Sequence, residues 1–81
     1  MSLEIYMPRM GSTTMESGEL VAWLVSEGDV VTEGQPLAEV ETDKITIEIP
    51  SPGDGRITGL VARPGDEIPV GATMGWIDEN S

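Results

Sequence analysis

The 81-residue chain contains no cysteine, no histidine and no phenylalanine. Without cysteine it forms neither disulfides nor thiolate metal sites, and thiol catalysis is excluded. Without histidine it lacks the commonest general base and the commonest metal ligand. A domain this short buries only roughly 60% of the surface that its unfolded chain exposes, so a deep active-site cleft has little room. These absences argue against an autonomous enzyme, and we expect neither catalytic residues nor a metal site.

Positive charge is also scarce. Four Lys and Arg residues stand against fifteen Asp and Glu, which gives a net charge of −11. Nucleic acids and anionic membranes are bound through basic patches, so we expect neither as a partner. No apolar run approaches the ~20 residues of a membrane span, and the first residues do not have the pattern of a secretory signal. We expect a location in the bacterial cytoplasm or an organelle matrix.

The chain has a single lysine, Lys44, and the surrounding pattern places it at a turn. Apolar and polar residues alternate from Ile45 to Ile49, which is typical of a half-buried strand. The segment from Leu37 to Glu41 forms a second apolar run, and the apolar residues stop between the two. We therefore predict a β-hairpin with Asp43 and Lys44 at its tip. A primary amine that occurs once, at a turn, is suited to covalent attachment.

An internal repeat relates the two halves of the chain. A shift of 37 residues aligns Gly18 with Gly55 and Gly28 with Gly65, and six apolar positions follow in the same register. A shift of 42 residues aligns Ile5 with Ile47. Two similar halves, each with an open apolar face, indicate an all-β flattened barrel or sandwich of two four-stranded antiparallel sheets with a pseudo-twofold repeat. We expect one domain over residues 1–81, with half-repeats at about 3–41 and 45–78.

The repeat predicts eight strands and two β-bulges. In the second and sixth strands the apolar spacing slips from two to three residues, so we expect a β-bulge near Ala22 and another near Gly59. The expected strands are Leu3–Met7, Gly18–Val25, Asp29–Val31, Leu37–Glu41, Ile45–Ile49, Gly55–Ala62, Glu67–Pro69 and Met74–Asp78.

The two halves differ in one loop. The step from Gly11 to Gly18 is five residues longer than the matching step from Gly53 to Gly55. The extra residues lie within the segment 12–17, and they are candidates for partner recognition or for ordinary variable surface. The candidate recognition residues are Ser12, Thr13, Thr14, Met15 and Glu16.

The segment E-T-D-K-I from Glu41 to Ile45, with G-D-x-V-x-x-G-Q-P-L-A-E-V-E before it and P-S-P-G-D-G-R-I after it, resembles the lipoyl domain family. These are the swinging-arm modules of 2-oxo acid dehydrogenase complexes. Family glycines sixteen before and eleven after the modified lysine match Gly28 and Gly55. The opening segment M-P-R-M-G-S-T-T-M is most similar to pyruvate- or acetoin-type acyltransferases, whereas Ile45 stands where the family more usually has alanine.

The resemblance implies a function for the hairpin. Lys44 would carry lipoate in amide linkage, with Glu41, Asp43 and Ile45 contributing to presentation and ligase recognition, and Gly28 and Gly55 serving turns or close strand approach. The implied partners are a lipoate ligase or lipoyl transferase, a thiamine-dependent 2-oxo acid decarboxylase, an acyltransferase core and a flavin-dependent dihydrolipoamide dehydrogenase. We expect a monomeric domain excised from a dihydrolipoamide acyltransferase rather than a free-standing carrier.

Two other functions compete with this one. A biotin carboxyl carrier has a closely similar fold, but that family flanks its lysine with methionine, and here Asp43 and Ile45 take those places. An unmodified barrel could serve as an interaction module. Paired-carboxylate catalysis and calcium binding are disfavoured because the acids are scattered rather than set at loop spacing.

Overall fold

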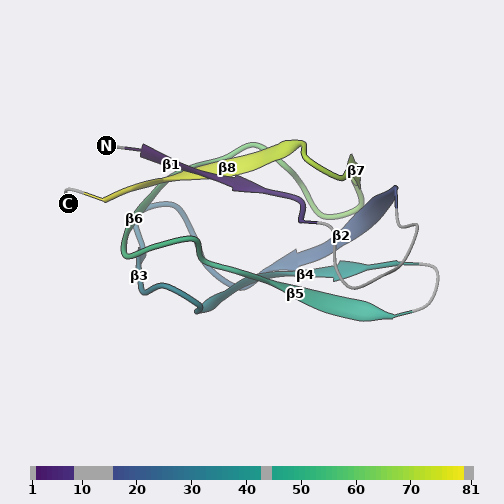
Figure 1. Ribbon diagram of the computed structural model, residues 1–81, viewed down its shortest axis with the longest axis horizontal. Helices are drawn as coiled ribbons and strands as arrows, with labels where there is room; N and C mark the ends of the chain where they lie inside the picture. The colour runs from purple at the N-terminus through teal and green to yellow at the C-terminus, as the bar shows by residue number, and fades with distance from the viewer. Residues whose placement is uncertain (1, 9–15, 43–44, 80–81) are drawn as a thin grey trace.

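The computed structural model describes residues 2–8, 16–42 and 45–79, and it is all-β over these residues. Eight strands form two four-stranded antiparallel sheets, as the sequence predicts (Figure 1). Sheet A has the order β1-β8-β6-β3, and sheet B has the order β5-β4-β2-β7. The strands are β1 Ser2–Tyr6, β2 Ser17–Trp23, β3 Val30–Val31, β4 Pro36–Glu41, β5 Thr46–Pro50, β6 Gly55–Leu60, β7 Glu67–Pro69 and β8 Thr73–Asp78.

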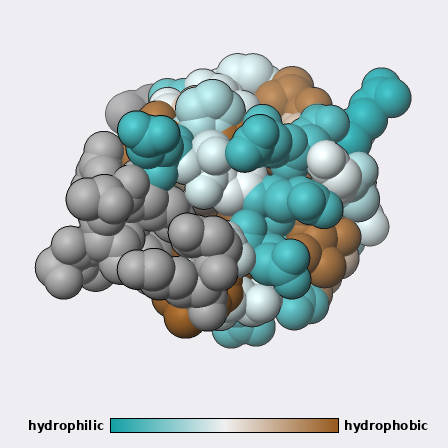
Figure 2. Space-filling view, turned by 90° about the vertical axis from the view of Figure 1, so that its right-hand side faces the viewer, coloured by the Kyte–Doolittle hydropathy of each residue, from teal (hydrophilic) through white to brown (hydrophobic). Residues whose placement is uncertain are grey.

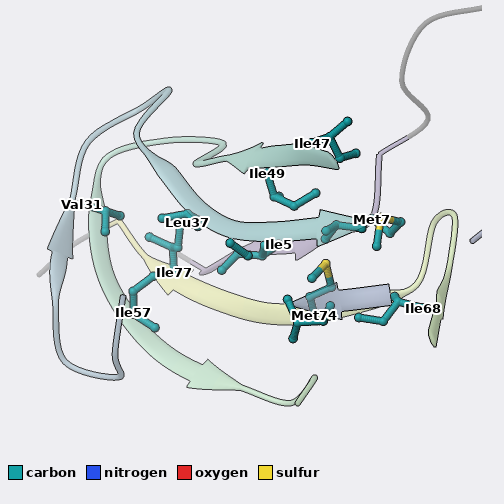
Figure 3. Packing of buried hydrophobic residues seen from close by; sticks show 13 residues of the cluster. Ile5, Met7, Val31, Leu37, Ile47, Ile49, Ile57, Ile68, Met74 and Ile77 are labelled. Atoms are coloured by element: carbon teal, nitrogen blue, oxygen red, sulfur yellow. The ribbon is translucent and has the colours of Figure 1, made fainter. Parts of the chain in front are cut away.

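The core lies between the two sheets and is built almost entirely from aliphatic side chains. Strand β5 shows why the sequence gives this arrangement: Ile47 and Ile49 are buried, whereas Thr46, Glu48 and Pro50 are exposed. Side chains from both sheets point toward one another in Figure 3. The fully buried aliphatic residues with the largest volumes are Ile5, Met7, Leu20, Leu37, Ile49, Ile57, Met74, Ile77, Val31 and Val40.

Both predicted bulges are present, and they obey the 37-residue repeat. The register of β2 against β4 shifts between Leu20 and Ala22. The register of β6 against β8 shifts between Ile57 and Gly59. An extra residue on one strand lets buried side chains three positions apart face the same core. The pseudo-twofold relation between the halves is therefore expressed in strand pairing as well as in sequence.

Several strand boundaries differ from the expected ones by one or two residues. Strand β2 ends at Trp23 rather than Val25, because the chain bends after Trp23 while Leu24 N–H still donates to Leu37 O at 2.8 Å. Strand β4 begins at Pro36, where a proline is tolerated as the first residue of a strand.

Trp23 links two segments that lie far apart in the sequence. Its ring Nε1–H donates to Ala62 O at 2.8 Å, and the side chain is half-buried. Trp76, by contrast, is 39% exposed on β8.

The ends of β4 and β5 that lead into their connection lie at the opposite end of the molecule from Ser2 and Asp78 (Figure 1). None of the described residues forms a helix with the length and hydrophobicity needed to cross a bilayer.

Candidate functional site

Strands β4 and β5 form the hairpin that the sequence predicts around its only lysine. Their pairing begins with Pro36 opposite Pro50, shifts register before Ala38, and ends with Glu41 opposite Thr46. Beyond the last pair, Thr42 N–H donates to Ile45 O at 2.8 Å. Only residues 43 and 44 separate these two partners in the chain. Asp43 and Lys44 themselves lie outside the described residues, so their predicted roles are not tested.

The side chain of Thr42 adds two more hydrogen bonds across the base of the turn. Its Oγ1 hydroxyl donates to Ile45 O at 2.8 Å, and Ile45 N–H donates to Thr42 Oγ1 at 3.1 Å. Short polar side chains stabilise turns in this way by bonding to nearby backbone. Sequence reasoning did not single out Thr42, although a threonine beside a two-residue turn is a usable signal.

Replacing Thr42 by Val is expected to loosen the base of the hairpin without changing its shape. The substitution removes both side-chain hydrogen bonds and keeps the Thr42 N–H bond, so the free energy of unfolding should fall by about 1 kcal/mol. Amide hydrogen exchange at Ile45 should accelerate. Thr46→Val, at an exposed threonine on β5, is the matched control and should change stability by no more than ~0.5 kcal/mol. Equal exchange at Ile45 in both variants would show that the Thr42 hydroxyl does not hold the turn.

Glu41 and Ile45 flank the connection, as the sequence predicts. Glu41 is the exposed last residue of β4, opposite Thr46 on one side and Glu19 on the other. Ile45 is 55% exposed and is one of several large hydrophobic side chains that reach the surface of the described part of the domain. The described base of the turn thus presents a carboxylate and an apolar side chain on either side of residues 43 and 44.

The predicted recognition loop is described only at its last residue. Ser12, Thr13, Thr14 and Met15 lie outside the described residues. Glu16 is exposed, and its carbonyl accepts a hydrogen bond from Val70 N–H at 2.9 Å. Because Glu19 pairs with Glu41, the beginning of β2 lies at the same end of sheet B as the base of the turn.

The two glycines that the sequence singles out have different surroundings. Gly28 is exposed in the turn after Ser26, with φ of 93°, and a Cβ there would meet nothing within 4 Å. Gly55 is the buried first residue of β6. A Cβ on Gly55 would lie 2.7 Å from Ile77 Cγ2 and would collide with the backbone oxygen of Asp78. Gly28 therefore serves backbone conformation, and Gly55 serves close strand approach.

The described residues on either side of the turn are exposed and do not form an enclosed binding site. Among them no group of His, Cys, Asp and Glu is arranged to hold a metal ion. A pocket of about 140 Å³ lies along β1 and the end of β5, lined by residues such as Tyr6, Pro8 and Pro52, away from the base of the turn. A cofactor joined covalently to lysine needs an exposed amine and no pocket. Glu41 and Ile45, on either side of residues 43 and 44, are both exposed.

Comparison with known proteins agrees with this geometry. The family described as "Biotin-requiring enzyme" matches residues 3–77. The chain is 51% identical over 70 residues to the lipoamide acyltransferase component of the branched-chain alpha-keto acid dehydrogenase complex of Pseudomonas aeruginosa, covering 86% of this chain and 16% of that protein. It is 42% identical over 73 residues to the dihydrolipoyllysine-residue acetyltransferase component of the acetoin cleaving system of Cupriavidus necator, covering 90% and 19%. The chain thus spans less than a fifth of these relatives.

Two solved structures share the architecture. The lipoyl domain of the 2-oxoglutarate dehydrogenase complex from Azotobacter vinelandii superposes with a TM-score of 0.69 at 25% identity, covering 93% of this chain and 96% of that one. A single-chain, multi-domain long-chain acyl-CoA carboxylase matches with a TM-score of 0.78 at 16% identity, covering 99% of this chain and 7% of that one, which shows the fold alone. The chain therefore belongs to the biotin- and lipoyl-attachment family and has the fold of a lipoyl domain.

Proposed function

We propose that Lys44 carries lipoate in amide linkage, and that the domain is the swinging-arm carrier of a 2-oxo acid dehydrogenase complex. The observation that carries the proposal is the position of the only lysine. It falls between Thr42 and Ile45, whose backbone and side-chain hydrogen bonds close the base of a β-hairpin. Membership of the biotin- and lipoyl-attachment family supports the same assignment.

The chain's own part in the chemistry is to present the amine and then to tether what is attached. A free lysine amine is protonated at neutral pH, so a ligase must supply an activated lipoyl group and a base that accepts the amine proton. The Nζ–C amide bond forms as the activating group leaves the acyl carbon. When bound, lipoate supplies a dithiolane that accepts acyl groups and electrons. Glu41, Asp43 and Ile45 hold the attachment point in a form that the ligase recognises.

The paired strands determine where the arm can reach. Pairing of β4 with β5 fixes the register on both sides of the turn, and a slip by one residue would move every alternating side chain to the opposite face. Tethering on a short flexible arm gives effective concentrations in the millimolar range at the active sites that the arm visits. The domain therefore needs no catalytic residue of its own.

The partners follow from this role. A thiamine-dependent 2-oxo acid decarboxylase would load the arm, an acyltransferase core would unload it, and a flavin dihydrolipoamide dehydrogenase would reoxidise it. The relatives include acyltransferase components of branched-chain, acetoin, pyruvate and 2-oxoglutarate systems. We place this chain with the pyruvate or acetoin type, as one monomeric domain over residues 1–81 of an acyltransferase in the bacterial cytoplasm or an organelle matrix. The loop residues 12–16 are the proposed contact with the decarboxylase.

Biotin is the second candidate, because the matched family is described by biotin and the fold is shared with a carboxylase. Measurement of the intact mass of the domain distinguishes lipoate attachment from biotin attachment. Incubation of the domain with lipoate ligase, ATP and lipoate should add one lipoyl group, whereas coexpression with biotin ligase should leave the domain unable to bind streptavidin. Capture on streptavidin, or an unchanged mass after treatment with the lipoate ligase, would contradict the proposal.

A further inference from the structure

The two halves of the chain, strands β1 to β4 and strands β5 to β8, are interleaved in both sheets. Sheet A combines β1 and β3 with β6 and β8, and sheet B combines β2 and β4 with β5 and β7. Of the six strand pairings among the described residues, four join the two halves: β1 with β8, β2 with β7, β3 with β6, and β4 with β5. Each half by itself keeps one pairing, β2 with β4 or β6 with β8. Neither half therefore buries its core without the other.

Turns inside each half are also bonded to the opposite half. In the first half, Gly28 N–H donates to Ile57 O at 2.7 Å. In the second half, Gly65 N–H donates to Leu20 O at 2.8 Å. The 37-residue repeat relates these two bonds, because it aligns Gly28 with Gly65 and Leu20 with Ile57. Each half thus supplies the bonds that complete the turns of the other.

The covalent link between the halves is the connection from β4 to β5. Three hydrogen bonds close its base, and all three join Thr42 to Ile45. These bonds hold the turn together and do not join one half of the barrel to the other at any further point. The ends of β4 and β5 that lead into the connection lie at one end of the molecule (Figure 1). Separation of Thr42 from Ile45 would therefore let the halves part at the surface of the barrel, outside its core.

A second copy of the chain supplies the strands that each half needs. If the connection opens, β5 of the second copy can pair with β4 of the first in the native register, with Glu39 opposite Glu48. The reciprocal exchange builds a second barrel from the two remaining halves. Every described strand pairing is kept, and the bonds between Thr42 and Ile45 are lost. Exchange of an identical element between protomers is a low-cost route to dimers, and short connections invite it.

The barrel selects unlike halves, although a repeat relates them. Trp23 aligns with Leu60 at the shift of 37, and both side chains pack against the core. Trp23 also crosses between the halves, because its Nε1–H donates to Ala62 O at 2.8 Å. A barrel of two first halves would hold two indoles where the native barrel has one, and a barrel of two second halves would hold none. Overpacking and cavities both destabilise a core, so exchange restores the native combination.

The exchange creates little new apolar interface between the two barrels. They would meet at the hairpin end, where hydrophilic residues cover much of the described surface and apolar residues form separate patches (Figure 2). Each chain also has a net charge of −11, and like charges repel most strongly at low salt. We therefore expect the monomer in dilute solution and the dimer at high protein concentration and high salt.

We propose that the connection between β4 and β5 is the hinge of a domain-swapped dimer, in which two copies exchange strands β5 to β8, and that the exchange withdraws the attachment residue from modification. In the dimer the chain runs from β4 of one barrel to β5 of the other, so Thr42 and Ile45 no longer close a turn. An enzyme that modifies lysine at a hairpin finds no hairpin there. This second part rests on the proposed function of Lys44, whereas the exchange of strands does not.

Pairs of introduced cysteines distinguish the two topologies, because the chain has no cysteine of its own. Glu39 and Glu48 lie directly opposite one another, one in each half. Directly opposed residues on antiparallel strands lie at a separation that a disulfide can span. In Glu39→Cys with Glu48→Cys, oxidation joins two positions of one chain in the monomer and joins two chains in the swapped dimer. Glu19→Cys with Glu41→Cys is the matched control, because these residues oppose one another within the first half.

The chains are refolded from urea at micromolar and at millimolar concentration in high salt, and size-exclusion chromatography separates monomer from dimer. After oxidation of the dimer, we expect the first pair to run as a linked dimer on a non-reducing gel and the control pair to run as single chains. Thr42→Val should lower the dissociation constant of the dimer by at least about tenfold, because each chain loses two hydrogen bonds that only the monomer makes. Thr46→Val is the control and should leave the dissociation constant within about twofold.

The outcomes separate the exchange of strands from the function of the hairpin. Absence of a dimer at millimolar concentration, or a dimer in which the first cysteine pair runs as single chains, would overturn the exchange. Isolated wild-type monomer and dimer are then treated with lipoate ligase, ATP and lipoate, and we expect intact mass to show modification of the monomer alone. Equal modification of both forms would overturn the withdrawal of the lysine. Modification of neither form would overturn the proposed function, while the gel would still decide whether strands are exchanged.

Discussion

Lys44→Arg is expected to abolish attachment of lipoate completely while leaving the fold unchanged. The chain has no other lysine, so the substitution leaves the α-amino group as its only primary amine. Arginine keeps the positive charge, but its guanidinium is not deprotonated in proteins and does not serve as the acyl acceptor. Intact mass after incubation with lipoate ligase, ATP and lipoate measures the effect. The free energy of unfolding should change by no more than ~0.5 kcal/mol, because arginine keeps the charge and a long side chain.

A second substitution, added to Lys44→Arg, tests whether lipoylation depends on where the amine lies as well as on its presence. Lys44→Arg combined with Thr46→Lys restores one amine two residues along β5, at an exposed site paired with Glu41. We expect no lipoylation of this variant, because the amine then lies within the strand ladder rather than at the turn. Efficient lipoylation at residue 46 would contradict the view that the hairpin presents the lysine. A lipoyl group on Lys44→Arg alone, located by peptide mapping, would contradict the site assignment.

Gly55→Ala is expected to have the largest effect on stability. Strand β6 lies between β8 and β3 in sheet A, and Gly55 pairs with Val31. A Cβ there would collide with the backbone oxygen of Asp78 and lie 2.9 Å from the Asp78 carbonyl carbon, at a φ of 158°. These neighbours are backbone atoms of the adjacent strand, so they cannot rotate away. We expect the free energy of unfolding to fall by at least about 3 kcal/mol, combining overpacking with backbone strain.

Gly59→Ala on the same strand is the matched control for Gly55→Ala. A Cβ on Gly59 would meet only the Cε3 atom of Trp76, at an ordinary contact distance of 3.5 Å. Its stability should change by no more than ~1 kcal/mol. Urea unfolding followed by the fluorescence of Trp23 and Trp76 measures both variants. Similar losses in the two variants would show that close approach to Asp78 is not what selects glycine at position 55.

Much of the fold could be predicted from local patterns in the sequence. Alternation between Ile45 and Ile49 predicted β5, and the slip of the apolar spacing in both repeats predicted bulges at the positions where the registers shift. These features could be inferred because side chains on a strand alternate with a period of two. A departure from that period has few structural explanations. The predicted ends of strands were less accurate. Strand β2 ends at Trp23 and not at Val25, because the point where a chain leaves a sheet depends on the neighbouring strands and not on its own pattern.

Residue roles that depend on spatial neighbours could not be predicted. The repeat aligns Gly18 with Gly55, yet a Cβ on Gly18 would collide with the side chain of Val40, whereas one on Gly55 would collide with backbone. The part that Thr42 plays at the turn also required coordinates, because the hydroxyl's partner is defined by the hairpin geometry.

The sequence by itself determined the all-β class, the repeat and the single amine between two strands, because period-two hydrophobicity and the count of lysines are properties of the chain alone. Only the tertiary structure decided which glutamates oppose one another. Glu19 and Glu67 are 48 positions apart in the sequence, and Glu19 and Glu41 are 22 apart, yet they occupy one row. Cross-strand register sets such neighbours, and it is fixed by how the two sheets share one core, not by any local segment.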